Sequence, residues 1–339
     1  MATGRPAVRV RLQDVADLAG VSMKTVSNVI HDYPHVSAAM RERVQAAIGE
    51  LGYRPNLTAR RLATGRTGMV ALAIPEIDQF YFAELARQIS DAAGRQGYRI
   101  IVEQTLNDVE AERAVIRDRE EGLVDGVVFQ PTRIDTREIA RLRPGTPLVL
   151  LGEAARPVTT DHVMIDNTRA ARDGVEMLLH GGRTRIAFLA LVRGDITEST
   201  HLRLVGYQEA LLDAGIPLDP ALVLESDGFA LDDGVRTISR AIAAGVHFDA
   251  ILCRDDQFAM AALRGLALAG LRVPTDVAVL GWDDTAVARY STPALSSVSP
   301  DKRMLAETAL RLLTDRMAGY EGIGRHVIVS HSIVERDTT

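Results

Sequence analysis

The sequence has almost no cysteine and lacks the marks of secreted and membrane proteins. Cys253 is its only cysteine, so no internal disulfide can form, and the apolar run around it favours a buried, unreactive thiol. No apolar run reaches the roughly 20 residues that span a membrane, and the first residues show no secretory signal pattern. We therefore expect a cytoplasmic protein with no membrane partner.

Patterns of common catalytic and cofactor sites are also missing. No Gly-x-Gly-x-x-Gly motif follows an expected strand, and there is no phosphate-binding loop and no Gly-x-Ser-x-Gly motif. The eight histidines show no spacing typical of metal ligands. We expect no catalytic residue, no cofactor and no metal site, which argues against an enzyme.

Charge is distributed unevenly along the 339 residues. Residues 1–66 hold ten Lys and Arg against five Asp and Glu, whereas the remainder holds 29 against 40. A basic head can approach phosphate groups, while an acidic body reduces non-specific binding to nucleic acid. A terminus that is basic by chance would explain the charge as well, so this reading needs the support of a motif.

The head has the pattern of three short helices that share one small core. Gly20 and Gly52 are suited to end the first and third helices, and Ser22 and Ser37 can cap the second and third. The apolar residues that recur at helical spacing in the three segments are Leu12, Val15, Ala16, Ala19, Val26, Val29, Ile30, Val44, Ala47, Ile48 and Leu51.

The second of these helices carries a polar stripe that is a candidate for reading DNA. Lys24, Ser27, Asn28 and His31 recur at helical spacing opposite the apolar face, and Met23 precedes them. In a helix-turn-helix the N-terminal residues of the second helix meet base edges in the major groove. Lysine can donate to guanine, asparagine can pair with a base edge or a phosphate, and methionine can pack on a thymine methyl. Solvated surface residues of an ordinary helix pair would give the same stripe.

The segment 55–63 strengthens the nucleic-acid interpretation. Pro55 and Asn56 favour a helix start, and Ala59 and Leu62 share one face beside Arg60 and its neighbour. An apolar wedge flanked by arginines suits insertion into a minor groove, where it unstacks a base step while the guanidiniums contact phosphates. A polar interdomain linker is the alternative, and residues 64–68 have that composition.

After Gly68 the chain alternates short apolar strands with segments of helical length, which predicts a parallel α/β fold. The pattern occurs twice, with strands expected at 70–74, 99–102, 127–129 and 148–151, and again at 186–189, 222–224, 250–253 and 277–280. The fold class is therefore an all-α helix-turn-helix head plus an α/β core of two doubly wound parallel-sheet lobes.

The predicted division of the chain follows from these patterns. The head takes residues 1–54, a hinge helix and linker 55–67, and a core for ligand binding and dimerisation 68–336. The first lobe takes about 68–163 plus 299–325, and the second about 164–298 plus 326–336.

Ligands of open parallel sheets bind beyond the carboxyl ends of the strands, so the residues that follow each expected strand are the pocket candidates. Carboxylates that accept hydroxyl hydrogen bonds and aromatic faces that stack on C–H-rich rings suit a sugar-like ligand. We expect Tyr81, Asp255 and Asp283 to contact it. For Asp256 and Asp284 we expect only the capping of the helices that follow.

The segments 10–22 (VRLQDVADLAGVS), 25–30 (TVSNVI) and 52–56 (GYRPN) resemble the lactose-repressor/galactose-repressor (LacI/GalR) family, and the resemblance extends over essentially the whole chain. It implies a periplasmic-binding-protein-like core and a repressor, with Leu62 as the hinge leucine at the operator centre and Ala59 at the dimer contact. The ligand contacts that it implies are Tyr81, Phe82, Asp166, Arg203, Phe229, Asp255 and Asp283. Three residues depart from the family: Arg11 replaces a common Ser or Thr cap, and Pro300 and Thr197 differ from sugar- and purine-responsive members.

Together these patterns predict a ligand-responsive transcription regulator. A small molecule, expected to be a sugar, would bind between the lobes and act allosterically through the hinge on DNA affinity. A homodimer would bind a pseudo-palindromic operator in double-stranded DNA. The chain ends without an apolar heptad tail, so we expect a dimer rather than a tetramer. The alternative is a cytoplasmic or secreted sugar-binding protein without a regulatory role.

Overall fold

The computed structural model describes residues 10–30, 33–53, 66–118, 122–141, 145–153, 158–194 and 197–339. Two compact units are present, Met1–Thr67 and Gly68–Thr339. The core predicted from the sequence also begins at residue 68.

The first unit contains the three expected helices, α1 (Leu12–Ala19), α2 (Met23–Ile30) and α3 (Ala38–Leu51). The predicted caps are confirmed: the Ser22 hydroxyl accepts from the Thr25 amide at 3.1 Å, and the Ser37 hydroxyl accepts from the Met40 amide at 3.4 Å. The glycines after α1 and α3 have φ 62° and 60°, which allows tight helix ends. The buried core of this unit is Val15, Ala16, Ala19, Val26, Val29, Val44 and Ala47.

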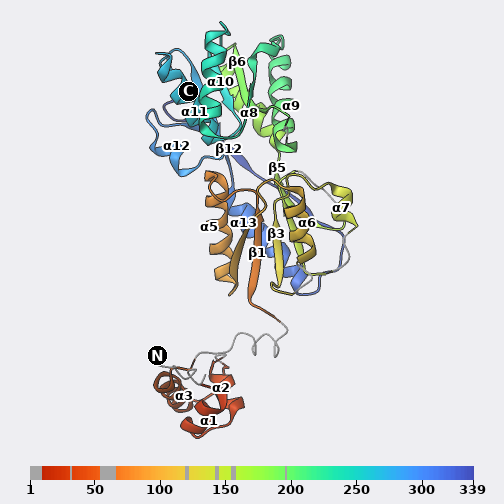
Figure 1. Cartoon of the computed structure of the whole chain (residues 1–339), viewed down its shortest axis with the longest axis vertical. Coiled ribbons are helices and arrows are strands. Elements are labelled where there is room, and N and C mark those ends of the chain that lie inside the picture. The colour runs from red at the N-terminus through yellow and green to blue at the C-terminus, as the bar shows by residue number, and fades with distance from the viewer. Residues whose placement is uncertain are drawn as a thin grey trace, which may run out of the picture. The chain divides into compact units, whose positions relative to one another are not determined.

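The second unit begins with a lobe built on a six-stranded parallel sheet with the order β11-β5-β4-β3-β1-β2. Its strands are β1 (Met69–Ile74), β2 (Arg99–Gln104), β3 (Gly126–Phe129), β4 (Leu148–Leu151), β5 (Asp161–Ile165) and β11 (His326–Val329). Its helices are α5 (Phe80–Arg95), α6 (Val109–Asp118), α7 (Thr136–Ala140) and α13 (Lys302–Met317). Because side chains alternate along a strand, Leu72 and Ile74 pack with α5 and α13, while Ala71 and Ala73 pack with α6 and α7 (Figure 1).

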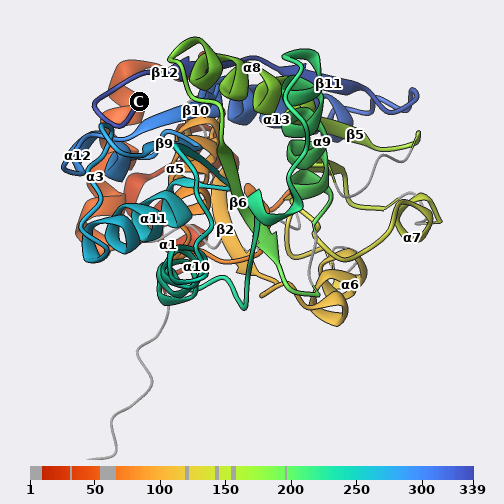
Figure 2. The same ribbon diagram turned by 90° about the horizontal axis from the view of Figure 1, so that it is seen from above.

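The second lobe has a six-stranded sheet with the order β12-β10-β9-β8-β6-β7, parallel except that β12 runs antiparallel to β10. Its strands are β6 (Ile186–Val192), β7 (Val223–Ser226), β8 (Ala250–Cys253), β9 (Ala278–Trp282), β10 (Ser296–Pro300) and β12 (His331–Val334). Its helices are α8 (Asn167–His180), α9 (Glu198–Asp213), the 3₁₀ turn Pro220–Leu222, α10 (Leu231–Ala243), α11 (Asp256–Leu268) and α12 (Ala286–Tyr290). Helices α8 and α9 lie on one side of β6, and α10 and α11 on the other (Figure 1 and Figure 2).

Two doubly wound lobes are thus confirmed, but the lobe boundaries are corrected. β5 continues to Ile165 and β11 pairs with it, so residues 164–165 and 326–329 belong to the first lobe. β10 reaches Pro300 in the second sheet, whereas the sequence placed residues 299–300 in the first lobe. β11 and β12 are short edge strands with largely exposed or half-buried residues, so no apolar run announced them.

The chain crosses between the lobes after Ile165, after Pro300 and after Val329. The Asp301 amide donates to the Ser330 carbonyl at 3.0 Å, which ties the second and third crossings together. Asp166 and Asp301 each accept a hydrogen bond in the first turn of the helix that follows, α8 and α13. Two of the three crossings therefore end in a capped helix start.

Candidate functional site

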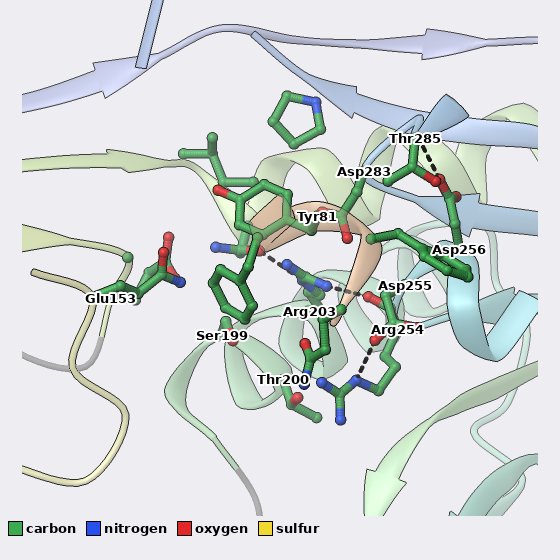
Figure 3. A pocket seen from close by; sticks show the side chains of 18 of the residues that line it. Tyr81, Glu153, Ser199, Thr200, Arg203, Arg254, Asp255, Asp256, Asp283 and Thr285 are labelled. Carbon is green, nitrogen blue, oxygen red and sulfur yellow. Dashed lines mark hydrogen bonds and ion pairs between the residues drawn. The ribbon is translucent and has the colours of Figure 1, made fainter. Parts of the chain in front are cut away.

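A cavity of about 100 Å³ lies between the two lobes, where the carboxyl ends of both parallel sheets meet. The first lobe contributes residues that follow β1, β3 and β4, and the second lobe contributes residues that follow β6, β8 and β9. Residues of the first two crossings, Ile165, Asn167 and Pro300, complete the lining. Figure 3 shows Glu153 on one side of Tyr81, with Arg254 and Asp255 on the other.

Arg203 projects from α9 into this cavity and is held on three sides. Its Nε donates to Asn167 Oδ1 at 2.7 Å and its Nη1 donates to the Arg254 carbonyl (Figure 3). Its guanidinium carbon lies 4.0 Å from the centre of the Trp282 ring. Burial lowers the pKa of Arg203, and the nearby Asp283 opposes this effect. The guanidinium is therefore a fixed cation that needs little ordering when a ligand binds.

Asp283 follows β9 directly and its side chain is 7% exposed. Its φ of 98° lies in a region that favours glycine, which is a form of backbone strain found at functional sites. Burial raises the pKa of this carboxyl from 3.8 to about 7, although Arg203 favours the charged form. Near neutral pH the group can thus act either as an acceptor or as a donor toward a ligand.

Asp256 is buried beneath the same wall and does not cap a helix, so the capping role expected for it is wrong. Its carboxylate accepts from the Thr285 amide and hydroxyl at 2.6 and 2.7 Å and from the Ser297 hydroxyl at 2.7 Å. Burial raises its pKa to about 6. Asp284 is not a cap either, because its carboxylate pairs with Arg336 at 2.6 Å. The spacing to the next helix suggested caps, but in the fold both carboxylates bond residues that are distant in the sequence.

Asp255, which was expected to contact ligand, caps α11 through the Phe258 amide at 2.7 Å and also lines the cavity. Its other oxygen pairs with Arg254 at 2.9 Å. Arg254 in turn lies over the Phe229 ring at 4.6 Å. Asp255 can thus cap α11 and line the cavity at the same time. Its ion pair with Arg254 holds the Arg254 guanidinium at the edge of the cavity.

Two buried polar atoms of the cavity wall have no hydrogen-bond partner within the described residues. They are the Nδ2 donor of Asn167, from the second lobe, and the Oε1 acceptor of Gln130, from the first. Burying such groups unpaired is costly, so a ligand or water is expected to supply the missing partners. Burial also raises the pKa of Tyr81 well above its usual value, which keeps its hydroxyl protonated and able to donate.

The wall is reinforced by a contact between the lobes. Lys302, on α13 of the first lobe, donates to the carbonyls of Asp283 and Asp284 in the second lobe, at 3.0 Å for Asp284. It also pairs with Glu84 of α5 at 3.0 Å, and Glu84 accepts from the Ala286 amide at 2.6 Å. The loop that carries Asp283 is thereby held by α5 and α13 of the first lobe.

The ligand residues expected from the sequence are placed unequally. Tyr81, Phe82, Arg203, Asp255 and Asp283 line the cavity, and Phe229 lines an adjoining hollow. Asp166 does not line either one and caps α8, whereas its neighbour Asn167 faces the cavity. Sequence reasoning missed Asn167 and Gln130. Gln130 follows β3 directly, so the strand-end rule applied to every strand would have included it.

The head presents the expected polar face on α2. Met23 and Lys24 are exposed, while Ser27 and Asn28 are half-buried. Val26 and Val29 on the opposite face are buried in the core of this unit. His31, Asn56, Ala59, Arg60 and Leu62 lie outside the described residues, so their predicted roles stay predictions.

Within the described ranges, no helix is both long and apolar enough to cross a membrane. In the same part of the chain, no group of three or more His, Cys, Asp or Glu side chains is placed to hold a metal ion.

Comparison with known proteins agrees with this architecture. The family described as bacterial regulatory proteins, lacI family, matches residues 11–56, and the periplasmic binding protein-like domain matches residues 175–339. The HTH-type transcriptional regulator CelR of Thermobifida fusca is 36% identical over 326 residues, covering 92% of this chain and 93% of that relative.

Solved structures give the same result. The lac repressor dimer bound to operator and the anti-inducer ONPF matches with a TM-score of 0.83 at 28% identity, covering 97% of this chain and 99% of that chain. A CelR–cellobiose complex matches with a TM-score of 0.72 at 32% identity, covering 98% and 100%. The resemblance seen in the sequence is confirmed: the chain belongs to the lacI family of bacterial regulatory proteins, which are DNA-binding transcription regulators.

Proposed function

We propose that this protein is a repressor that binds a pseudo-palindromic operator as a homodimer and is controlled by a sugar bound between its lobes. The observation that carries the ligand class is the pair of unpartnered atoms on two residues that line the cavity, the Asn167 donor and the Gln130 acceptor. A hydroxyl group both donates and accepts, so a polyhydroxylated ligand can satisfy both atoms and bridge the lobes. The carboxyl of Asp283 and the aromatic faces of Tyr81 and Phe82 add the acceptor and the apolar surface that a sugar ring uses.

The relatives support this proposal in its separate parts. One solved neighbour is a regulator in complex with cellobiose, and another is a repressor dimer on its operator. In the present chain, the exposed Lys24 and the half-buried Asn28 would supply the base contacts. A dimer of such heads implies an operator with two related half-sites.

Control by the ligand requires different affinities for two arrangements of the lobes. A ligand that bonds Gln130 of one lobe and Asn167 of the other at once would favour the arrangement in which both are in reach. The segment 55–67 would pass this preference to the head, with Leu62 at the operator centre.

The test is a thermal-shift screen of sugars and nucleobases, followed by operator binding with each hit. A ligand at 100 times its Kd should stabilise the core by about 2.7 kcal/mol. The operator is first selected from random DNA with the full-length protein. Asp283→Ala should retain operator binding and lose the ligand response.

The outcomes separate the parts of the proposal. A hit among nucleobases alone would refute the sugar class and leave ligand control intact. A sugar that stabilises the protein without changing operator affinity would refute its role as effector. A normal ligand response in Asp283→Ala would remove Asp283 from the site.

A further inference from the structure

The cavity between the lobes continues into a second hollow of about 90 Å³, and the two share part of their walls, including Gln79, Gln130 and Arg254. Asn107 and Thr132 complete this outer hollow from the first lobe. Each hollow is several times larger than the roughly 10–15 Å³ that a single water needs. Two adjoining spaces of similar size therefore lie between the lobes.

The first-lobe wall of the outer hollow is held in place by a chain of hydrogen bonds. Gln79 and Asn107 both donate to the carboxylate of Glu76, at 2.8 and 2.9 Å. The Thr132 hydroxyl lies 3.1 Å from Asn107 Oδ1 and 2.8 Å from the fully buried carboxylate of Glu112, which also accepts three backbone amides of this loop. These polar groups are thus ordered before any ligand arrives, which reduces the entropic cost of binding.

The second-lobe wall offers a flat surface opposite these polar groups. Phe229 is half-buried there, and Arg254 lies over its ring while being paired with Asp255. Glu198, in the first turn of α9, adds a carboxylate. A flat aromatic and guanidinium surface facing a row of hydroxyl and amide groups suits a ring that has C–H faces and polar edges.

The charges of both hollows disfavour an anion. Glu153, Glu198, Asp255 and Asp283 contribute carboxyl groups to the walls. The guanidinium of Arg203 already bonds Asn167 and a backbone carbonyl, and that of Arg254 is paired with Asp255. These four carboxyl groups outnumber the two guanidiniums, so a sugar phosphate or a sugar acid would meet an excess of like charge along the walls.

We propose that the ligand of this protein is an uncharged disaccharide whose two rings fill the two hollows. One ring lies in the inner cavity with Arg203, Asp283 and Asn167, and the other lies between Thr132 and Phe229 in the outer hollow. This assignment rests on the proposed function, because it names the size and charge of the ligand in the same site.

Isothermal titration of the full-length protein compares each disaccharide with its own monosaccharide, using glucose with cellobiose and maltose, galactose with lactose, and xylose with xylobiose. One disaccharide should bind about 30-fold more tightly than its monosaccharide, since the outer hollow adds a stacked face and one or two hydrogen bonds. The phosphorylated monosaccharides should not bind.

Two variants locate the second ring. Phe229→Ala should weaken the disaccharide about tenfold, and Thr132→Val about fivefold, with the affinity for the monosaccharide unchanged in both. Unchanged monosaccharide binding also shows that each variant is folded. Thr132→Ser keeps the hydroxyl and should bind the disaccharide as the wild type does.

Equal affinities for a monosaccharide and its disaccharide would overturn the two-ring assignment and leave the proposed function standing. An affinity for the disaccharide that is unchanged in Phe229→Ala would overturn the assignment as well. If no sugar of either length binds, the ligand class of the proposed function fails together with it.

Discussion

Replacing Asp283 by Asn should stabilise the core relative to the wild type, and increasingly so as the pH rises. The side chain is 7% exposed, and burial raises the pKa of its carboxyl from 3.8 to about 7. Ionising it inside the folded protein is therefore costly, whereas in the unfolded chain it ionises freely. An amide of the same shape avoids that cost because it does not titrate.

The size of the effect follows from proton linkage. A group whose pKa is raised by folding contributes stability that is complete below its unfolded pKa and is lost as the pH rises to its folded pKa. One pKa unit corresponds to about 1.36 kcal/mol, so between pH 5 and pH 8 the wild type should lose about 3 kcal/mol that the variant keeps.

Urea unfolding followed by tryptophan fluorescence measures this difference without a label. Trp282 is the only tryptophan, is 0% exposed and lies beside Asp283, so its emission reports on unfolding of the core. Asp232→Asn, which removes an exposed carboxylate from the first turn of α10, is the matched control and should differ from the wild type by a constant amount across this pH range. Parallel stability profiles for the wild type and Asp283→Asn would refute the reasoning.

Three further predictions concern other parts of the chain. Lys302→Met should lower the free energy of unfolding by about 2 kcal/mol and weaken sugar binding, because Glu84 and two carbonyls of the Asp283 loop lose their partner; denaturant unfolding and titration calorimetry measure both, and wild-type values would contradict the contact. Asp161→Asn should cost about 3 kcal/mol at neutral pH in denaturant unfolding, because this fully buried carboxylate pairs with Arg316 and Arg325; a change below 1 kcal/mol would show that the pairs add little. Lys24→Ala should alter the base preference in operator selections from random DNA, and an unaltered binding-site logo would exclude it from readout.

Local signals in the sequence were sufficient for most of the elements that bury apolar runs. The caps Ser22 and Ser37 and strands such as β4 and β8 were predicted because each is set by a few neighbouring residues. Four strands were not predicted: β5 and β10 contain polar residues that interrupt the apolar pattern, and the short edge strands β11 and β12 expose residues and are recognised only by the sheet that receives them.

In the candidate site, too, a local rule identified some residues, while the roles of others depended on tertiary contacts. The rule that ligand residues follow strand ends brought Tyr81 and Asp283 to one cavity. It could not distinguish Asp166 from Asn167, since which of two adjacent residues caps α8 and which turns inward depends on the partner across the cavity, here Arg203. The roles of Asp256 and Asp284 likewise depended on residues 29 to 52 positions away in the sequence.

The position of the three crossings bears on how a ligand could transmit force. If the lobes rotate about these crossings, atoms near them move little, so a ligand that contacts only Ile165, Asn167 and Pro300 would bind both arrangements almost equally well. Such contacts add to the affinity for the ligand but do not favour either arrangement of the lobes. The outer hollow includes none of these residues, so its walls should move more when the lobes rotate. A single ring that contacts only the residues near this axis would then bind without changing operator affinity. The length of the ligand, rather than its affinity, would decide how strongly it changes operator binding.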